Sequence, residues 1–381
     1  METMKTTGYF DHAATTFPST KALERYRSAA LEYWANPSTK YPEGRKSHAY
    51  LETIRDSIAK MLDVRPNHII FTSGATEAND IVFQSLLLRL SPGEVIISGI
   101  EHSSIIQQQR ILEQAGWKII MLRAPRGFIN PEDLEKALTS KTRLVSIMSL
   151  NNAVGTLQDI PALTGIVREY EKTTGRAIHF HTDATQQLGK LPIDFAAWDV
   201  DSASFGAHKF HGPKGVGFLY NTSQGVENLS KGGGQEGGLR GGTENLAGIA
   251  SMEAALAEAL ANQKRVTEHV TRLNDLFRQT LKSHVTVLTQ REHSSPYIIT
   301  VSTALPAEVM VRMLIERGFS VSAGSACSSN ARAKGQRVLE MMEVTPEHRG
   351  GAIRISFSDS NTEEETVSLA RAINTVAKET V

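Results

Sequence analysis

Between His68 and Tyr220 the sequence alternates short runs of β-branched residues with longer segments of helical pattern. This alternation is typical of βαβ units and predicts an α/β domain with a mainly parallel sheet. Ligands of such sheets bind at the carboxyl ends of the strands, so residues that follow a strand are the first candidates for a functional site. Seven strands are expected, at 68–71, 94–98, 118–122, 143–147, 177–181, 202–205 and 216–220, and helices between them at 77–90, 104–115 and 161–173.

A glycine-rich stretch at 231–243 leads into a long helical pattern at 244–280, in which a break is expected near Gln263. The stretch contains Gln, Glu, Arg and Thr, so it lacks the Gly/Ser composition of a flexible linker. Beyond it, short strand and helix patterns predict a smaller α+β domain. We expect a large domain at 15–255 and a small domain formed by 1–14 together with 256–381. The small domain should contain strands at 297–301, 320–322 and 352–357 and helices at 307–317, 338–342 and 362–379.

The chain has 41 basic and 41 acidic residues in 381, a balance that gives no electrostatic reason to expect nucleic acid or an anionic membrane as partner. No apolar run approaches the ~18 residues of a spanning helix, and no signal segment precedes Tyr9. A cytoplasmic protein is expected. A single cysteine, Cys327, excludes an intrachain disulfide and a four-cysteine metal site, and no metal ligands are assigned.

Lys209 follows one of the expected strands and precedes a Gly-Pro-Lys-Gly turn. A lysine fixed by rigid backbone can lose the hydration of its ammonium group, and its neutral amine can then form a Schiff base with an aldehyde cofactor. Pyridoxal phosphate is the candidate cofactor. Taken alone, the same pattern also fits a surface lysine in a glycine-rich hairpin.

Several other residues follow predicted strands. Thr76 lies where a strand end turns into a helix start, a place that suits a phosphate group. His102 could stack on a flat cofactor or move a proton, or be an ordinary solvated loop residue. Asp183 could pair with the pyridinium nitrogen of the cofactor, or cap a helix. Asn151 and Asn152 could supply a hydrogen bond to a ring hydroxyl, or belong to an ordinary Asn-rich turn.

Two candidates lie near the C-terminus. Arg354 stands inside a strand pattern, and its guanidinium group could bind the carboxylate of an amino acid, although an edge-strand arginine would have the same pattern. Cys327 lies among small and polar residues with Arg332 and Lys334 nearby, which favours an exposed loop and a reactive thiolate over a buried thiol.

With His102, Asp183, Lys209, 241–243 and the Ser-Ala-Cys of 325–327 in this order, the chain resembles the cysteine desulfurases of the class V aminotransferase family. The likeness extends from Tyr-Phe-Asp-His-Ala-Ala-Thr-Thr at 9–16 to 361–365, and the cysteine segment is similar to that of the longer-looped group that serves iron-sulfur assembly. It implies a fold-type I pyridoxal phosphate transferase with a seven-stranded sheet, whose small domain carries the catalytic cysteine loop. It also implies a homodimer that converts L-cysteine to L-alanine and passes sulfur to acceptor or iron-sulfur scaffold proteins.

The resemblance implies roles for individual residues around the cofactor ring. Lys209 would be the Schiff-base lysine, His102 would stack on the ring, and Asp183 would pair with the ring nitrogen. Gln186 and Asn152 would form hydrogen bonds near the ring oxygen. Asn152 would also face the substrate carboxylate.

The remaining roles concern the phosphate, the substrate and the sulfur. The resemblance implies that Thr76 and His208 bind the phosphate and that Thr243 reaches it from the neighbouring subunit. Arg354 would bind the substrate carboxylate, and Cys327 would attack the substrate sulfur and retain it as a persulfide.

The chain departs from the family pattern at three places, where a polar group expected near the cofactor is missing: Gly206, Gly237 and Ala153. We expect these departures to affect phosphate affinity and rate, and not the type of reaction. Two other functions stay open from the sequence. One is a lyase acting on selenocysteine or cysteine sulfinate in the same pocket, and the other is a non-enzymatic sulfur carrier or scaffold paralogue.

Overall fold

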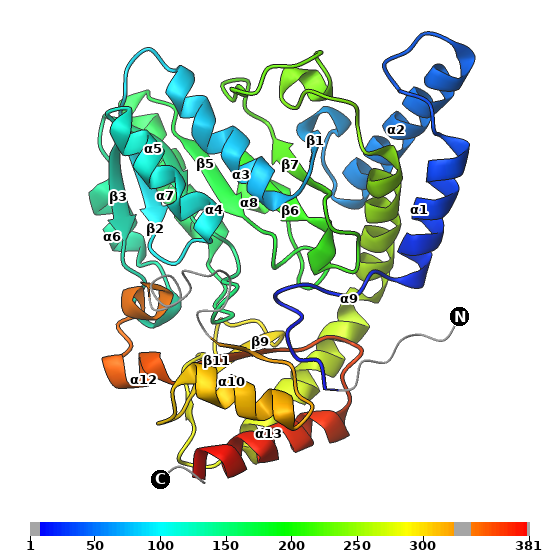
Figure 1. Ribbon diagram of the computed structural model, residues 1–381. Helices are drawn as coiled ribbons and strands as arrows, with labels where there is room; N and C mark the ends of the chain where they lie inside the picture. Colours follow the sequence, from blue (N-terminus) through cyan, green and yellow to red (C-terminus); the bar gives the residue numbers. More distant parts are fainter. Residues whose placement is uncertain (1–7, 324–336, 379–381) are drawn as a thin grey trace.

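The structure is a computed structural model that describes residues 8–323 and 337–378. These residues form two sheets, a large one in the upper half of Figure 1 and a small one below it. Helix α9 (Leu246–Thr280) extends from the large sheet to the small one. Each sheet has its own hydrophobic core, and α9 contributes to both, with Leu246–Leu256 in the first and Val270–Phe277 in the second.

The large sheet has seven strands in the order β1-β7-β6-β5-β4-β2-β3. Strands β6, β5, β4, β2 and β3 pair in parallel, whereas β7 pairs antiparallel with both of its neighbours. The prediction of a mainly parallel seven-stranded sheet is therefore confirmed. The strands are β1 (Ile69–Thr72), β2 (Glu94–Ser98), β3 (Lys118–Leu122), β4 (Thr142–Ser146), β5 (His179–Asp183), β6 (Ser202–Gly206) and β7 (Gly217–Asn221).

Helices cover this sheet, and several of them were not expected from the sequence. Helices α1 and α2 pack against the first part of α9 (Figure 1), and the segment expected as one helix at 104–115 is divided into α4 and α5. The helices are α1 (Thr20–Glu32), α2 (Pro42–Met61), α3 (Ala75–Gln84), α4 (Ser103–Ile106), α5 (Gln108–Gln114), α6 (Pro131–Ala137), α7 (Ile160–Thr174) and α8 (Phe195–Trp198).

The break expected near Gln263 does not occur, since α9 is continuous over 35 residues. The apolar pattern is interrupted there because the helix leaves one core before it enters the other. The interval Ala261–Glu268 contains neither glycine nor proline, the residues that most disfavour a helix interior, so the backbone continues through it. The interruption of the pattern marked a change of packing partner and not a change of backbone conformation.

The small sheet is antiparallel, in the order β10-β11-β9-β8, and α10 and α13 pack together beside it. The start of the chain joins this sheet, because Tyr9 pairs with Ser320 and Asp11 pairs with Ser356. The elements are β8 (Thr286–Val287), β9 (Ile298–Ser302), β10 (Ser322–Ala323), β11 (Ala352–Ser356), α10 (Ala307–Glu316), α12 (Pro346–Gly350) and α13 (Glu363–Lys378).

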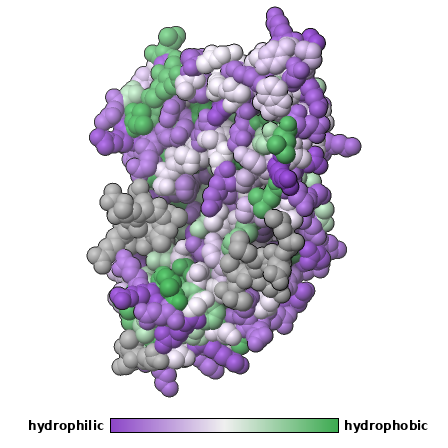
Figure 2. All heavy atoms as spheres, turned by 45° about the vertical axis from the view of Figure 1, so that its right-hand side comes forward, coloured by the Kyte–Doolittle hydropathy of each residue, from purple (hydrophilic) through white to green (hydrophobic). Residues whose placement is uncertain are grey.

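Most of the molecular face shown in Figure 2 is hydrophilic, and hydrophobic side chains reach it in small separate patches. Over the described ranges, none of the helices combines the length and the apolar character needed to cross a membrane.

Candidate active site

The residues Asp11–Thr16, named here the 11–16 segment, connect most of the predicted site residues. The segment leaves the small sheet at Asp11 and reaches the turn after β6, where Thr16 N donates to His208 O at 2.9 Å. Backbone carbonyls of this segment accept hydrogen bonds from two of the predicted side chains, Lys209 and Gln186. The site therefore lies where the large sheet meets the small one.

Lys209 ends the short 3-10 turn that follows β6. It is half-buried, and its Nζ donates to Ala13 O and to Ala14 O, both at 2.7 Å. The side chain thus lies against the 11–16 segment, which disfavours the alternative of a solvated surface lysine. The turn positions the amine close to the carboxyl ends of β5 and β6, the strands that pair at Asp183 and Ser204.

Gln186 and Lys190 form a second contact with the same segment. The buried Gln186 donates from Nε2 to Ala13 O at 2.9 Å, and its Oε1 accepts from Lys190 Nζ at 3.0 Å. Burial, together with the nearby charges of Lys209 and Arg354, lowers the pKa of Lys190 to about 7. Lys190 was not foreseen from the sequence. It adds a third cationic group to the region in which an anionic cofactor and an anionic substrate are expected.

Asp183 is the last residue of β5 and is buried. Its Oδ1 accepts from Thr185 N at 3.0 Å, and its Oδ2 accepts from Asn79 Nδ2 at 3.1 Å. A second buried carboxyl group lies nearby on Glu101, whose Oε1 accepts from Met148 N at 2.6 Å. Burial, and secondarily the charge of Asp183, raises the pKa of Glu101 well above its ordinary value. Glu101 was also missed in the sequence.

His102 precedes α4 and is half-buried. Its Nδ1 lies 2.9 Å from Ser104 Oγ and 3.2 Å from Ser104 N. Ser104 Oγ in turn accepts from Asn79 Nδ2 at 2.8 Å, the same group that donates to Asp183. Although 81 positions separate His102 from Asp183 in the sequence, a chain of hydrogen bonds joins them in the fold.

The phosphate group was predicted to bind near Gly206, where the start of α3 and His208 approach each other. A Cβ at Gly206 would fit without a clash, in van der Waals contact with Ala75 N, the His208 ring and the Thr185 methyl group, each at 3.6 Å. His208 Nδ1 is 3.1 Å from Thr15 Oγ1, and burial, with the charge of Lys209, lowers the pKa of His208 to about 4. The start of α3 and His208 thus border the space that a serine would fill at position 206.

Thr76 and Thr243 are both exposed. Thr76 lies in the first turn of α3, close to the space beside Gly206, whereas Thr243 Oγ1 accepts from Asn36 Nδ2 at 3.3 Å. In the described part of the chain, no hydrogen bond joins Thr243 to another predicted site residue. The glycine-rich stretch nevertheless approaches α3, since Arg240 Nε lies 3.3 Å from Glu77 Oε1.

Arg354, in β11, is buried and is held on two sides. Its Nη1 donates to Asn152 O at 2.9 Å, and its Nη2 forms an ion pair with Asp11 Oδ1 at 2.7 Å. Ser322 Oγ donates to Asp11 Oδ2 at 2.8 Å. The proximity of Arg354 to Asn152 agrees with the expected pair, although the contact uses the backbone of Asn152. The ion pair with Asp11 was not expected.

Two of the three departures have local explanations. Gly237 has φ of 64°, in the left-handed region that glycine adopts at little cost and an arginine does not. Ala153 lies within a tight turn in which Asn151 Oδ1 accepts from Ala153 N at 2.8 Å and from Val154 N at 2.9 Å. Asn151 is therefore a turn residue, and the role of Asn152 at the site stays a prediction.

Cys327 lies outside the described residues, but both ends of the chain around it lie at the site. Ala323 follows Ser322, which bonds to Asp11, and Arg337 Nη2 donates to Glu101 O at 2.7 Å. Cys327 is four positions after Ala323 in the sequence, and a fully extended chain spans at most about 14 Å over four positions.

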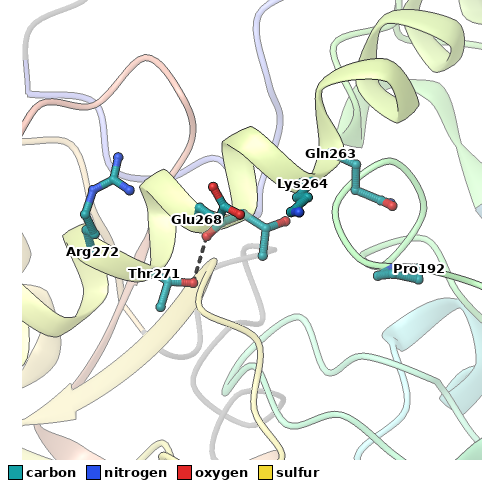
Figure 3. A pocket seen from close by; sticks show the side chains of 7 residues that line it. Pro192, Gln263, Lys264, Glu268, Thr271 and Arg272 are labelled. Atoms are coloured by element: carbon teal, nitrogen blue, oxygen red, sulfur yellow. Dashed lines mark hydrogen bonds between the residues drawn. The ribbon is translucent and has the colours of Figure 1, made fainter.

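A surface cavity of about 640 Å³ lies elsewhere, beside the middle of α9 (Figure 3). None of the predicted catalytic or cofactor residues lines it. Its lining residues are Pro192, Gln263, Lys264, Thr267, Glu268, Thr271 and Arg272.

A model of the family described as Aminotransferase class-V matches residues 8–369, nearly the whole chain. The chain belongs to this family. The match confirms the family expected from the sequence, and the similar solved structures confirm the fold type. Class V aminotransferases use pyridoxal phosphate.

Individual relatives of the class V family give the same picture. A protein named cysteine desulfurase IscS from Dictyoglomus turgidum is 36% identical over 370 residues, which cover 95% of this chain and 92% of the relative. A NifS/IcsS protein homolog from Lactobacillus delbrueckii is also 36% identical, covering 94% of each chain. Among solved structures, a NifS-like protein has a TM-score of 0.90 at 33% identity, covering 98% of this chain and 100% of its own. A structure described as SspA in complex with cysteine has a TM-score of 0.79 at 29% identity, covering 92% and 99%.

Proposed function

We propose that this protein is a pyridoxal phosphate-dependent cysteine desulfurase, which converts L-cysteine to L-alanine and leaves the sulfur on Cys327 as a persulfide. The observation that carries the proposal is the convergence of Lys209, Gln186 and Arg354 on the 11–16 segment, beside the buried carboxylate of Asp183. An amine, a carboxylate and a guanidinium group in one site are the groups needed to bind an aldehyde cofactor with a basic ring and an amino-acid substrate.

The residues present fit pyridoxal phosphate. Asp183 supplies a carboxylate for the ring nitrogen, Lys209 an amine for the aldehyde, and His102 an imidazole for the ring face. The start of α3, whose Ala75 N and the neighbouring His208 ring lie beside Gly206, would offer a backbone N–H and an imidazole to the phosphate. When bound, the cofactor would supply a ring that accepts electrons from the substrate α-carbon.

The side chains of this protein would carry out the remaining tasks. Arg354, beside Asn152, binds the substrate carboxylate and fixes the α-carbon near Lys209. The neutral Nζ of Lys209 accepts the α-proton. The Cys327 thiolate attacks the substrate sulfur, so that the new S–S bond replaces the bond between Cβ and sulfur, and a proton on carbon completes alanine.

We also propose a homodimer in which Thr243 completes the phosphate site of the partner subunit. Helix α1 and the loop after it expose large apolar side chains, including Leu31 at 71% and Trp34 at 70%. Such side chains are unusual on a monomer surface and suit a protein interface. Asn36, in the same loop, donates to Thr243 Oγ1 at 3.3 Å, so the loop with exposed apolar side chains contacts the loop that would reach the neighbouring site.

Sulfur would then leave Cys327 for acceptor or iron-sulfur scaffold proteins. The similarity to relatives named cysteine desulfurase supports the step before this transfer, the removal of sulfur from cysteine. A free, reactive thiol is maintained in a reducing compartment, which supports a cytoplasmic location.

The proposal can be tested by mass spectrometry of the protein after addition of pyridoxal phosphate and L-cysteine. We expect a mass increase of one sulfur atom on the peptide that contains Cys327, together with release of alanine. Cys327→Ser should bind the cofactor normally and yield neither persulfide nor substantial sulfide. Alanine and sulfide production at the parental rate by this variant would contradict the proposed sulfur transfer.

Lys209→Ala tests the central residue, and Lys214→Ala is its matched control, because Lys214 is an exposed lysine in the next turn of the chain. We expect Lys209→Ala to abolish alanine release and visible cofactor absorbance, and Lys214→Ala to leave both within about twofold. Equal activity of the two variants would refute the assignment. Rates of alanine release from cysteine, selenocysteine and cysteine sulfinate then distinguish a desulfurase from the two lyases, and an absence of turnover on all three would indicate the sulfur carrier or scaffold.

A further inference from the structure

Asn79 is a completely buried carboxamide on α3 that contacts two other elements. Its Nδ2 donates to Asp183 Oδ2 at 3.1 Å and to Ser104 Oγ at 2.8 Å. Its Oδ1 lies 2.9 Å from His181 Nε2. One side chain thus joins α3 to β5 and to α4. It contacts Asp183 directly, and it contacts His102 through Ser104.

The chemistry of these partners fixes the orientation of the amide. A carboxylate only accepts hydrogen bonds, so the group that faces Asp183 must be the NH₂ of Asn79. The amide oxygen therefore faces His181, whose Nε2 must carry the hydrogen. His181 Nδ1 then accepts from Ser202 Oγ, 2.8 Å away. Complete burial lowers the pKa of His181 to about 3, which agrees with a neutral imidazole here.

The same reasoning continues from Asn79 to His102. Ser104 Oγ accepts from Asn79 Nδ2, so the Ser104 hydroxyl hydrogen is directed to His102 Nδ1 at 2.9 Å. The backbone N–H of Ser104 also donates to Nδ1, at 3.2 Å, and a backbone N–H is always a donor. Nδ1 of His102 is therefore an acceptor, and the neutral imidazole carries its hydrogen on Nε2.

We propose that Asn79 is a positioning residue that couples the two ring-contacting groups of the site. By orienting the Ser104 hydroxyl it supports the Nε2–H tautomer of His102 together with the Ser104 backbone N–H, and through its own NH₂ it fixes the orientation of the Asp183 carboxylate. Since one NH₂ group serves both, a displacement of α3 disturbs both groups together. Only the statement that these two groups face a cofactor depends on the proposed function; the tautomer and the orientation follow from the hydrogen bonds.

The direct test is nitrogen-15 NMR of the full-length protein labelled at histidine, recorded with and without pyridoxal phosphate. We expect His102 and His181 to show a protonated Nε2 and an unprotonated Nδ1 in the cofactor-free protein. The resonances are assigned with His102→Gln and His181→Gln. A protonated Nδ1 on His102 would overturn the proposal, and this readout does not depend on whether the protein is a desulfurase.

Two variants separate the branches of the network. Ser104→Ala removes the hydroxyl from His102 without altering the contact of Asn79 with Asp183, so it should shift the His102 nitrogen signals and leave those of His181 unchanged. Asn79→Leu removes both branches, so it should shift the signals of both histidines. If Asn79→Leu does not fold, Ser104→Ala and the parental spectra still decide the matter.

Turnover gives a second readout. We expect kcat for alanine release to fall by about tenfold in Asn79→Leu and by a smaller factor in Ser104→Ala, with little change in KM for L-cysteine, because neither residue contacts the substrate. Unchanged histidine signals in both variants would refute the proposal even if the protein proves to be a cysteine desulfurase. Expected signals without any desulfurase activity would refute only the proposed function.

Discussion

Replacing Glu236 by glutamine should destabilise the large domain and loosen the glycine-rich loop. The side chain of Glu236 is only 1% exposed and forms a two-pronged ion pair with Arg55, in which both N···O distances are 2.8 Å. Its Oε2 also accepts from Phe71 N in β1 at 2.8 Å. One carboxylate therefore connects the loop that carries Thr243 to α2 and to the large sheet.

The magnitude follows from the burial of the pair. Glutamine has the same size, but it leaves the Arg55 guanidinium group, 10% exposed, without its buried counterion and turns an NH₂ toward it. Removal of one partner from a buried ion pair costs about 3–5 kcal/mol. Arg55 also contacts Glu52 at 3.2 Å, and Glu52 is 44% exposed, so partial compensation is available. We expect a loss near the lower limit, about 3 kcal/mol.

The assay is urea unfolding of parent and variant at equal protein concentration, because dimerisation would add a concentration-dependent term. Glu52→Gln is the matched control, since it removes the exposed partner of the same arginine and should cost less than about 1 kcal/mol. Adding Arg55→Met to Glu236→Gln should recover part of the loss. Equal losses for the two glutamine variants, or no recovery in the double variant, would refute the argument from a buried charge.

Three further outcomes are expected. Burial lowers the pKa values of His12 to about 3, His179 to about 4 and His181 to about 3, whereas the pKa of a histidine in the unfolded chain is about 6.5. The free energy of unfolding should therefore fall as the pH drops below about 6.5, by about 1.4 kcal/mol per pH unit for each of these histidines. The raised pKa of Glu101 has the opposite effect, because protonation of this buried carboxyl group favours the folded state as the pH falls. The measurement therefore uses the Glu101→Gln variant, and a free energy of unfolding that stays constant between pH 6.5 and 5 in this variant would contradict the histidine argument. Lys190→Met should stabilise the protein by about 3 kcal/mol more at pH 6 than at pH 9. The cost of burying an ammonium group whose pKa is about 7 is fully present below pH 7 and disappears toward pH 10.5, the pKa in the unfolded chain. An equal gain at both pH values would count against this reasoning. Asp11→Asn should lower KM for L-cysteine severalfold with little change in kcat, because the Asp11 carboxylate would compete with the substrate carboxylate for Arg354. A raised KM would show that Asp11 assists substrate binding instead.

The sequence predicted the strands of the large sheet and the residues that follow them, because both depend on local patterns. Asp183 and Lys209 could be singled out in this way, since each lies at a strand end with a distinctive neighbourhood. Arg354 could be singled out because an arginine within an apolar strand is unusual. These are the parts of the site in which the type of side chain itself is the signal.

The 11–16 segment could not be predicted as a part of the site from residue types. It contacts Lys209 and Gln186 through the backbone carbonyls of Ala13 and Ala14, and a carbonyl oxygen has no signature in a sequence. The spacing of Gln186 and Lys190 also carried no signal, because the two residues lie in turns and not on one helix.

Asn79 shows a different limitation. Its helical neighbours are ordinary, and its importance arises from contacts with Ser104 and Asp183, 25 and 104 positions away in the sequence. A buried asparagine on a helix could have been flagged as a residue that needs partners. Which partners it has depends on how α3 packs on β5, a tertiary property.

The ion pair between Asp11 and Arg354 has a consequence for biosynthesis. The two residues are 343 positions apart, so Asp11 is synthesised long before Arg354, and the contact can form only after β11 has been translated. A nascent chain can complete the large sheet through β7 while β11 is still untranslated, yet its site lacks the guanidinium group and the carboxylate of Asp11 has no counterion. The site therefore becomes complete only after β11 has been synthesised, and translation products truncated before β11 contain Lys209 without the guanidinium group proposed to bind an amino acid beside it.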